Sequence, residues 1–185
     1  MSDSDQDAFS IAALNWANPE AAVDMLARVT ERSDWLAVRL AAHRPYADAQ
    51  ELGDRLQAEI LSLTPQDSLR LLAAHPELAP PRPTAMTQAS QAEQGRLALT
   101  DPAPALAARL NALNTAYQQR FGFPFVIALH AFEDMERVIA RFESRLRNAP
   151  EVERRQALSE VVSVARARLA RLTGADERVV GEATR

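Results

Sequence analysis

The chain has 185 residues, 47% of them hydrophobic, which suffices for one compact domain with its own core. It contains no cysteine, which excludes disulfide bonds, thiolate metal sites and thiol nucleophiles. The net charge is −4 and the basic residues are dispersed, so we expect no nucleic-acid partner. No apolar run approaches the ~20 residues of a membrane-spanning helix, and the acidic start MSDSDQDAFS differs from a targeting peptide. We therefore expect a cytoplasmic protein without a membrane partner.

The first half of the chain is divided into helices by prolines and capping residues. Abundant Ala, Leu, Arg, Glu and Gln, with only five glycines, favour helix over strand throughout. The predicted helices and their caps are residues 19–32 after Asn18, 34–43 after Ser33, 49–63 after Asp48, and 65–74 after Thr64. His75 ends the last of them, and Pro76 follows directly.

The second half begins with a loop over residues 76–89, which contains four prolines. The helices predicted after it are 90–99 capped by Ser90, a long one from Asp101-Pro102 to Phe121 ended by Gly122, then 133–147 and 150–172. A short extended segment is predicted near 123–128. The sum is an all-α single compact domain of about seven to eight helices over residues 13–173, with flexible ends at 1–12 and 174–185.

His75 has two interpretations at the end of its helix. Its ring can satisfy a terminal carbonyl and interact favourably with the helix dipole. Alternatively, Pro76 restricts the backbone at His75 and holds an imidazole that titrates near neutral pH in place for proton transfer. His43 precedes Arg44-Pro45 and passes the same local test, whereas His130 follows an apolar run and is expected to pack. Local sequence does not choose among the three histidines.

Glu93 also has two interpretations. With Ser90 it matches a capping box, in which the acidic side chain bonds back to the N-cap amide. The same helix start would present free amides to a ligand, and a carboxylate fixed there could hold a histidine or a substrate N–H.

Two further features require polar partners. An extended apolar segment at 123–128 leaves backbone N–H and C=O groups to be satisfied by neighbouring loops, by water or by a planar polar ligand. On a helical wheel, Arg168 falls in the apolar sector of the last helix, whereas Arg166 and Arg171 fall outside it. A core-facing arginine needs an internal carboxylate or a bound anion, and both remain open.

The segments that carry these features resemble, in this order, those of the OHCU decarboxylases. They are AAHPELA, SQAEQ, LNALNTAYQQRFGFPFVIALH and, beyond FESRLRN, ALSEVVSVARARLARL. The resemblance extends over about residues 13 to 173. It implies an all-helical, cofactor-free and often dimeric enzyme that converts 2-oxo-4-hydroxy-4-carboxy-5-ureidoimidazoline (OHCU) to (S)-allantoin. Its pathway neighbours would be hydroxyisourate hydrolase and a urate-oxidising enzyme.

The resemblance also implies a set of site residues, none of them a metal ligand. The catalytic residues would be His75 and Glu93. The substrate-binding residues would be Pro76, Ser90, Gln91, Ala92, Glu93, Gln94, Phe125, Val126, Ile127, Ala128, Leu129 and Arg168. The chain departs from the family pattern at Glu77, where many members have aspartate, and at Gly95-Arg96-Leu97, where small residues are expected. Two alternatives stay open: a paralogue that acts on a related ureido or imidazole acid, and a helical ligand-binding module without catalysis.

Overall fold

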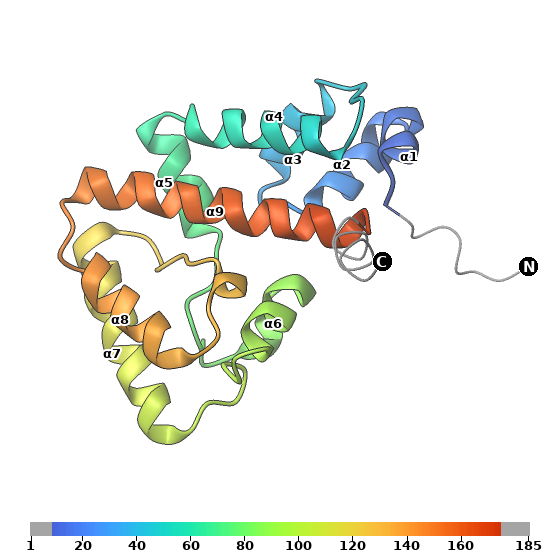
Figure 1. Ribbon diagram of the computed structural model, residues 1–185. Coiled ribbons are helices and arrows are strands. Elements are labelled where there is room, and N and C mark those ends of the chain that lie inside the picture. Colours follow the sequence, from blue (N-terminus) through green and yellow to red (C-terminus); the bar gives the residue numbers. More distant parts are fainter. Residues whose placement is uncertain (1–8, 175–185) are drawn as a thin grey trace, which may run out of the picture. The chain divides into compact units, whose positions relative to one another are not determined.

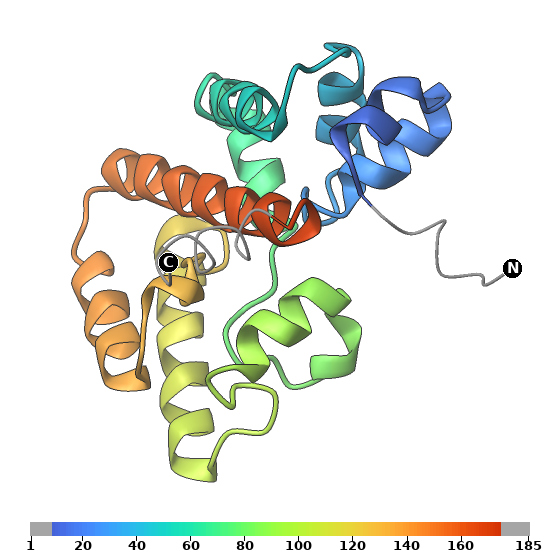
Figure 2. The same cartoon turned by 45° about the vertical axis from the view of Figure 1, so that its right-hand side comes forward.

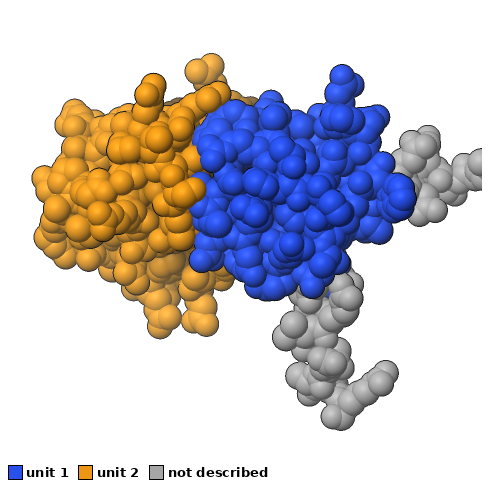
Figure 3. All heavy atoms as spheres, turned by 90° about the horizontal axis from the view of Figure 1, so that it is seen from above, with its two compact units in different colours: residues 1–59, 165–185 blue, residues 60–164 orange. Residues whose placement is uncertain are grey.

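A computed structural model describes residues 9–174, and this part of the chain contains nine α-helices, two short 3-10 helices and no β-strand. The all-α prediction is confirmed. The described residues divide into two compact units: unit 1 runs to Glu59 and resumes at Ala165, and unit 2 is Ile60–Val164 (Figure 3). The predicted flexible ends fall mostly on residues 1–8 and 175–185, outside the described residues, and the boundaries at 13 and 173 stay predictions.

Unit 1 is built from the N-terminal helices. They are α1 (Ile11–Trp16), α2 (Pro19–Ala27), α3 (Asp34–Ala41) and most of α4 (Ala49–Leu61), with the end of α9 (Pro150–Leu172) (Figure 1). The predicted cap of α2 is confirmed, since Asn18 Oδ1 accepts the Ala21 N–H at 2.9 Å. The predicted extension of this helix to residue 32 is wrong, because α2 ends at Ala27 and the following turn carries Glu31 into the core of the unit.

Unit 2 holds the remaining elements. They are α5 (Pro65–Ala73), η2 (Pro83–Ala85), α6 (Gln88–Gly95), α7 (Pro104–Phe121), η3 (Leu129–Ala131), α8 (Met135–Arg145) and most of α9. Helices α7 and α8 lie side by side in both views (Figures 1 and 2). Between them Tyr117 and Phe142 are in edge contact, with ring centroids 5.6 Å apart, and Phe142 stacks on Phe125 at 3.8 Å. This aromatic core supports the extended segment after α7.

Three helix starts differ from the prediction. Helix α8 begins at Met135, after its cap Asp134, and not at Glu133. Helix α6 begins after Thr87, whose Oγ1 accepts the Ser90 N–H at 3.2 Å, so Ser90 is the third residue of the helix and not its cap. Helix α7 begins at Pro104 and not at Asp101-Pro102. For α6 and α7, two neighbouring positions carry a valid start signal, a hydroxyl residue or a proline, and the tertiary fold selects the other one.

Helix α7 ends at Gly122, as predicted, and this glycine adopts a left-handed φ of 79°. Gly122→Ala is expected to lower the free energy of unfolding by about 1–2 kcal/mol, because a Cβ atom disfavours that backbone region. A Cβ atom there would meet no other atom within 4 Å, so steric contact adds nothing to this cost.

Gly95→Ala is the matched control, since a Cβ atom at this helical position also enters open space. It is expected to raise the free energy of unfolding by about 0.5–1 kcal/mol through the better helix propensity of alanine. Urea titration of both variants followed by circular dichroism measures the difference. Equal effects of the two substitutions would contradict the assignment of strain to Gly122.

Candidate active site

His75 follows α5 by two residues and is held from both its backbone and its ring. Its N–H donates to the Leu72 carbonyl at 3.1 Å, and Nδ1 lies 3.0 Å from the Leu71 carbonyl oxygen. Because a carbonyl oxygen only accepts, Nδ1 carries the hydrogen of this bond, and Nε2 is the nitrogen whose proton can come and go. The residue is 8% exposed. The capping interpretation and the proton-transfer interpretation of His75 are therefore compatible, one for each ring nitrogen.

The other two histidines are exposed. In unit 1, His43 Nε2 lies 3.1 Å from Glu59 Oε1. The packing role expected for His130 is wrong: η3 turns its ring outward, and its Nε2 lies 3.3 Å from the Ser163 hydroxyl. Residues 9–174 contain no group of three or more His, Asp or Glu side chains arranged to hold a metal ion, and no helix long and apolar enough to cross a membrane.

Gln94 ties the loop after His75 to α6. Its Oε1 accepts the Ala79 N–H and its Nε2 donates to the Glu77 carbonyl, both at 2.8 Å. Between these two residues, the Leu78 carbonyl accepts from Asn114 Nδ2 at 2.9 Å. The buried amide of Gln94, predicted to contact substrate, is therefore used to hold the backbone that follows His75.

Gln94→Leu is expected to lower the free energy of unfolding by about 1–3 kcal/mol, because the Ala79 N–H and the Glu77 carbonyl lose their buried partner. Leucine has a similar volume, so little of this loss comes from packing. Gln88→Leu at the exposed first position of α6 serves as the control and should change stability far less. Thermal denaturation of both variants checks this, and an unchanged melting temperature for Gln94→Leu would contradict the role of Gln94.

Glu93 does not lie at the start of α6, where both the capping-box and the ligand-binding interpretation had placed it. Glu93 is the sixth residue of the helix, so it cannot form a capping box with Ser90, and that interpretation is wrong. The Gln91 N–H is bonded to the Thr87 carbonyl at 2.9 Å and its side chain donates to the Met86 carbonyl at 3.0 Å. Backbone amides from Gln91 onward are thus inside the helix, and a ligand could reach residues 91–94 only through their side chains.

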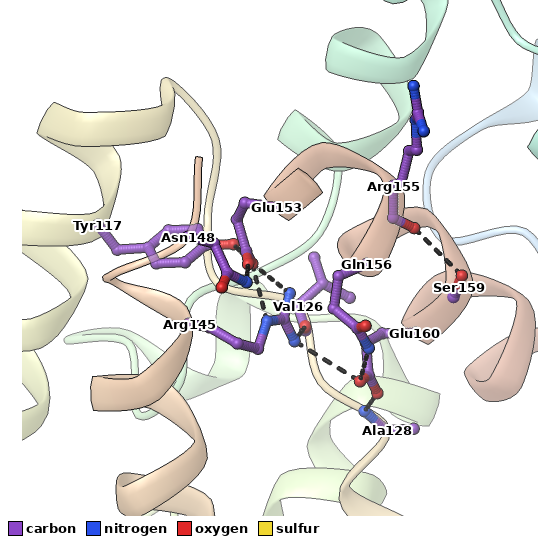
Figure 4. A network of polar contacts seen from close by, with 10 residues as sticks. All are labelled: Tyr117, Val126, Ala128, Arg145, Asn148, Glu153, Arg155, Gln156, Ser159 and Glu160. Carbon is purple, nitrogen blue, oxygen red and sulfur yellow. Dashed lines mark hydrogen bonds and ion pairs between the residues drawn. The ribbon is translucent and has the colours of Figure 1, made fainter. Parts of the chain in front are cut away.

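The segment Phe125–Leu129, extended up to the start of η3 at Leu129, is buried, and charged side chains pair with part of its backbone (Figure 4). Arg145 Nη1 donates to the Val126 carbonyl at 2.8 Å, and Glu160 Oε2 accepts the Ala128 N–H at 2.9 Å. Arg96, one of the departures from the family pattern, donates through Nη2 to the Leu129 carbonyl. The sequence left open whether loops, water or a ligand satisfy this backbone; side chains from α8, α9 and the end of α6 do so in part.

A buried network lies behind Arg145. Glu153 Oε1 accepts from Arg145 Nε at 2.8 Å and from the Tyr117 hydroxyl, and Glu153 Oε2 accepts from Asn148 Nδ2 at 2.7 Å (Figure 4). Burial, together with the hydrogen bond to Glu153, raises the pKa of Tyr117 above its ordinary value, so the phenol stays a donor. The Arg145 guanidinium also lies 4.5 Å above the Phe125 ring. The network fixes Arg145 from several sides.

Ile127 has no hydrogen-bond partner for its N–H or its C=O within residues 9–174, although it is only 6% exposed. The same holds for Phe125, which is 1% exposed. Buried backbone groups are nearly always paired, so an unpaired donor and acceptor on one residue are the feature expected of a ligand-binding edge. This agrees with the ligand interpretation for Phe125 and Ile127, and Ile127 is the one that lies between the two backbone groups bound by Arg145 and Glu160.

Arg168 lies in unit 1 and is 4% exposed, so the wheel prediction that it faces the core is confirmed. Its Nη1 donates to Glu31 Oε2 at 2.9 Å, which supplies the internal carboxylate that the sequence left unidentified. The substrate-binding role of Arg168 stays a prediction. The ion pair with Glu31 does not exclude a bound anion or substrate at Arg168, because a guanidinium has five N–H donors.

Several polar residues were missed by the sequence arguments. The wheel that singled out Arg168 also places Arg145 on the apolar face of α8, with Val138 and Phe142, and would have found it. Glu31 and Glu160 have no comparable local signal, since each is defined by a partner far away in the chain: Arg168 and the Ala128 N–H, respectively.

Comparisons with known proteins agree with the resemblance. The OHCU decarboxylase profile matches residues 15–170. The 2-oxo-4-hydroxy-4-carboxy-5-ureidoimidazoline decarboxylase of Haloferax volcanii is 34% identical over 157 residues, which are 85% of this chain and 92% of the relative. A uric acid degradation bifunctional protein of a Bacillus species is 31% identical over 156 residues, 84% of this chain and 30% of its own length. A solved OHCU decarboxylase, crystallised in the presence of (S)-allantoin, shares the fold with a TM-score of 0.67 and 21% identity, over 85% of this chain and 99% of its own. On the profile match and the identity to these relatives, the chain belongs to the OHCU decarboxylase family.

Proposed function

We propose that this chain decarboxylates OHCU to (S)-allantoin in urate degradation. The observation that carries the proposal is the family match over residues 15–170, with a histidine at the predicted catalytic position. The Haloferax volcanii relative bears the name of this decarboxylase, and the solved family member was crystallised with (S)-allantoin, the product that the reaction would form.

The proposed reaction sets clear demands on the protein. The substrate carboxylate leaves as CO2, the electron pair of the broken C–C bond moves into the adjacent C=N bond of the ring, and one proton is taken up. Because the ring imine accepts these electrons, the substrate itself provides the electron sink that a cofactor supplies in other decarboxylases. The protein must orient the carboxylate out of the ring plane, stabilise charge on the ring nitrogen and deliver the proton to one face.

We assign proton transfer to His75, whose Nε2 is the exchangeable nitrogen once Nδ1 donates to the Leu71 carbonyl. Glu93 would orient His75 or accept a ureido N–H. The unpaired N–H and C=O of Ile127 would pair with amide groups of the ring or the ureido arm. For Arg168 we retain the predicted charge-assisted bond to a substrate oxygen or ring nitrogen.

The pathway context is part of the same proposal. The Bacillus relative is named for uric acid degradation, and this chain covers only 30% of it, so that protein carries a further segment. We infer that hydroxyisourate hydrolase and a urate-oxidising enzyme supply the substrate. A homodimer and a cytoplasmic location follow from the family resemblance and the composition and stay predictions.

The direct experiment generates the unstable substrate in place. Urate is treated with urate oxidase and hydroxyisourate hydrolase, the protein is added, and optical rotation is followed. Rapid appearance of optical rotation from a single enantiomer, identified as (S)-allantoin, supports the proposal. Slow formation of racemic product at the rate of the protein-free control would overturn it and favour the non-catalytic module. Turnover of a related ureido or imidazole acid, with OHCU left unchanged, would favour the paralogue.

A further inference from the structure

Two charged side chains hold the two peptide units that flank Ile127. Arg145 binds the Val126 carbonyl, and that carbonyl shares its peptide plane with the Ile127 N–H. Glu160 binds the Ala128 N–H, which shares its plane with the Ile127 carbonyl. We call Arg145 and Glu160 the two clamps. Each clamp binds one polar group of a planar peptide group, and the other polar group of that peptide group is the unpaired N–H or C=O of Ile127.

Peptide planarity then sets where these unpaired groups point. Both peptide groups are trans, since the cis peptide bond of the described residues is at Arg44-Pro45. In a trans peptide group the C=O and the N–H point in opposite directions. Arg145 Nη1 and Glu160 Oε1 are 3.6 Å apart, so the two clamps act from the same side. The N–H and C=O of Ile127 are therefore directed together to the opposite side, as a donor and an acceptor next to each other.

The charges of the clamps also strengthen this pair. A guanidinium at the Val126 carbonyl draws electron density along the peptide unit and makes the Ile127 N–H a better donor. A carboxylate at the Ala128 N–H has the opposite effect on its unit and makes the Ile127 carbonyl a better acceptor. The cation thus strengthens the Ile127 N–H as a donor, and the anion strengthens the Ile127 carbonyl as an acceptor.

The clamps are themselves held in place. Arg145 is buried against Glu153, with 2.6 Å between Nη2 and Oε1, and Glu160 Oε1 accepts from Gln156 Nε2 at 2.9 Å. Figure 4 shows Arg145 reaching both carboxylates and Glu160 reaching Ala128. Because this backbone is already held in place, the donor–acceptor pair loses little conformational entropy when it binds a ligand.

We propose that Arg145 and Glu160 are positioning residues, which aim and polarise the Ile127 donor–acceptor pair toward a planar amide or urea edge of the substrate. The inference rests on the proposed function for the identity of that substrate. Neither residue was a candidate in the sequence, and neither is assigned contact with the reacting atoms.

The test compares Glu160→Gln with Glu151→Gln. Glutamine at 160 can still accept the Ala128 N–H but carries no charge, so polarisation is lost while the hydrogen bond remains. Glu151 is an exposed carboxylate of the same helix, paired with Arg154 and Arg155, and is the matched control. Glu160→Gln is expected to raise KM and the dissociation constant of (S)-allantoin by about tenfold, with a smaller change in kcat, because one charge-assisted bond is replaced by a neutral one.

A spectroscopic readout separates positioning from stability. The Ile127 carbonyl carbon and amide proton shifts, measured by NMR on the free protein, should move in Glu160→Gln and stay unchanged in Glu151→Gln. Gln156→Leu removes the donor that holds Glu160 and leaves the charge of Glu160 unchanged. It should also raise the dissociation constant of (S)-allantoin, by a smaller factor than Glu160→Gln. This variant provides the test if Glu160→Gln does not fold.

The outcomes distinguish this inference from the proposed function. If the wild-type protein turns over OHCU but Glu160→Gln matches Glu151→Gln in KM, product affinity and Ile127 shifts, the positioning role is wrong. If the wild-type protein lacks decarboxylase activity and the Ile127 shifts still respond to Glu160→Gln, the proposed function fails and the polarised edge remains. Loss of kcat alone, with unchanged KM and shifts, would also overturn the positioning role.

Discussion

His75→Ala is expected to reduce the rate of OHCU decarboxylation by about 10²–10⁴-fold, the usual contribution of a general acid or base. The substitution removes Nε2, the ring nitrogen that can exchange a proton while Nδ1 is bonded to the Leu71 carbonyl. The coupled optical-rotation assay measures the rate, and circular dichroism checks that the helices remain. A rate within a few-fold of wild type would remove His75 from the proton-transfer role.

His75→Asn separates the two functions of the ring. An asparagine amide can still donate to the Leu71 carbonyl, so stability should be largely retained, but it has no nitrogen that titrates near neutral pH. Its activity should therefore be as low as that of His75→Ala. The controls are His43→Ala and His130→Ala, at the two exposed histidines, which should leave the rate unchanged.

Arg168→Ala is expected to lower the free energy of unfolding by about 3–5 kcal/mol, because it leaves the Glu31 carboxylate buried without this cation. The Glu31 side chain is 1% exposed, so its carboxylate is poorly solvated in the folded protein. Chemical denaturation measures the loss. Arg166→Ala on the same helix, where the arginine pairs with the exposed Asp54, is the control and should have a much smaller effect. Equal effects of the two substitutions would contradict a buried ion pair.

A double variant decides whether Arg168 has a role beyond this pair. Replacement of both partners by apolar residues of similar volume, in Glu31→Leu with Arg168→Met, should recover much of the lost stability, since no buried charge is left alone. If Arg168 serves only the fold, decarboxylase activity returns with stability. If Arg168 also binds substrate, the stable double variant stays inactive, with a raised KM or no turnover.

Local signals predicted much of the fold correctly. Asn18 and Thr64 cap α2 and α5 through their side chains, and Gly122 ends α7, because each of these interactions depends on residues within one helical turn. The bounds of α9, Pro150–Leu172, agree with the predicted 150–172 for the same reason. Where two start signals stood three residues apart, at Thr87 and Ser90, the local rule applied to both and chose wrongly.

The sequence by itself determined the all-α class, most helix boundaries to within about two residues, the inward direction of Arg168 and, through its resemblance, the family. These follow from periodicity and from bonds within a turn, which short stretches of chain contain completely. Only the tertiary structure decided the partners. Arg168 meets Glu31 across 137 residues, and Arg145 and Glu160, from separate helices, bind the residues before and after Ile127. Such pairs are products of how the helices pack, so no local pattern specifies them. Two of these residues, Arg145 and Glu160, flank the buried backbone edge proposed to bind the substrate.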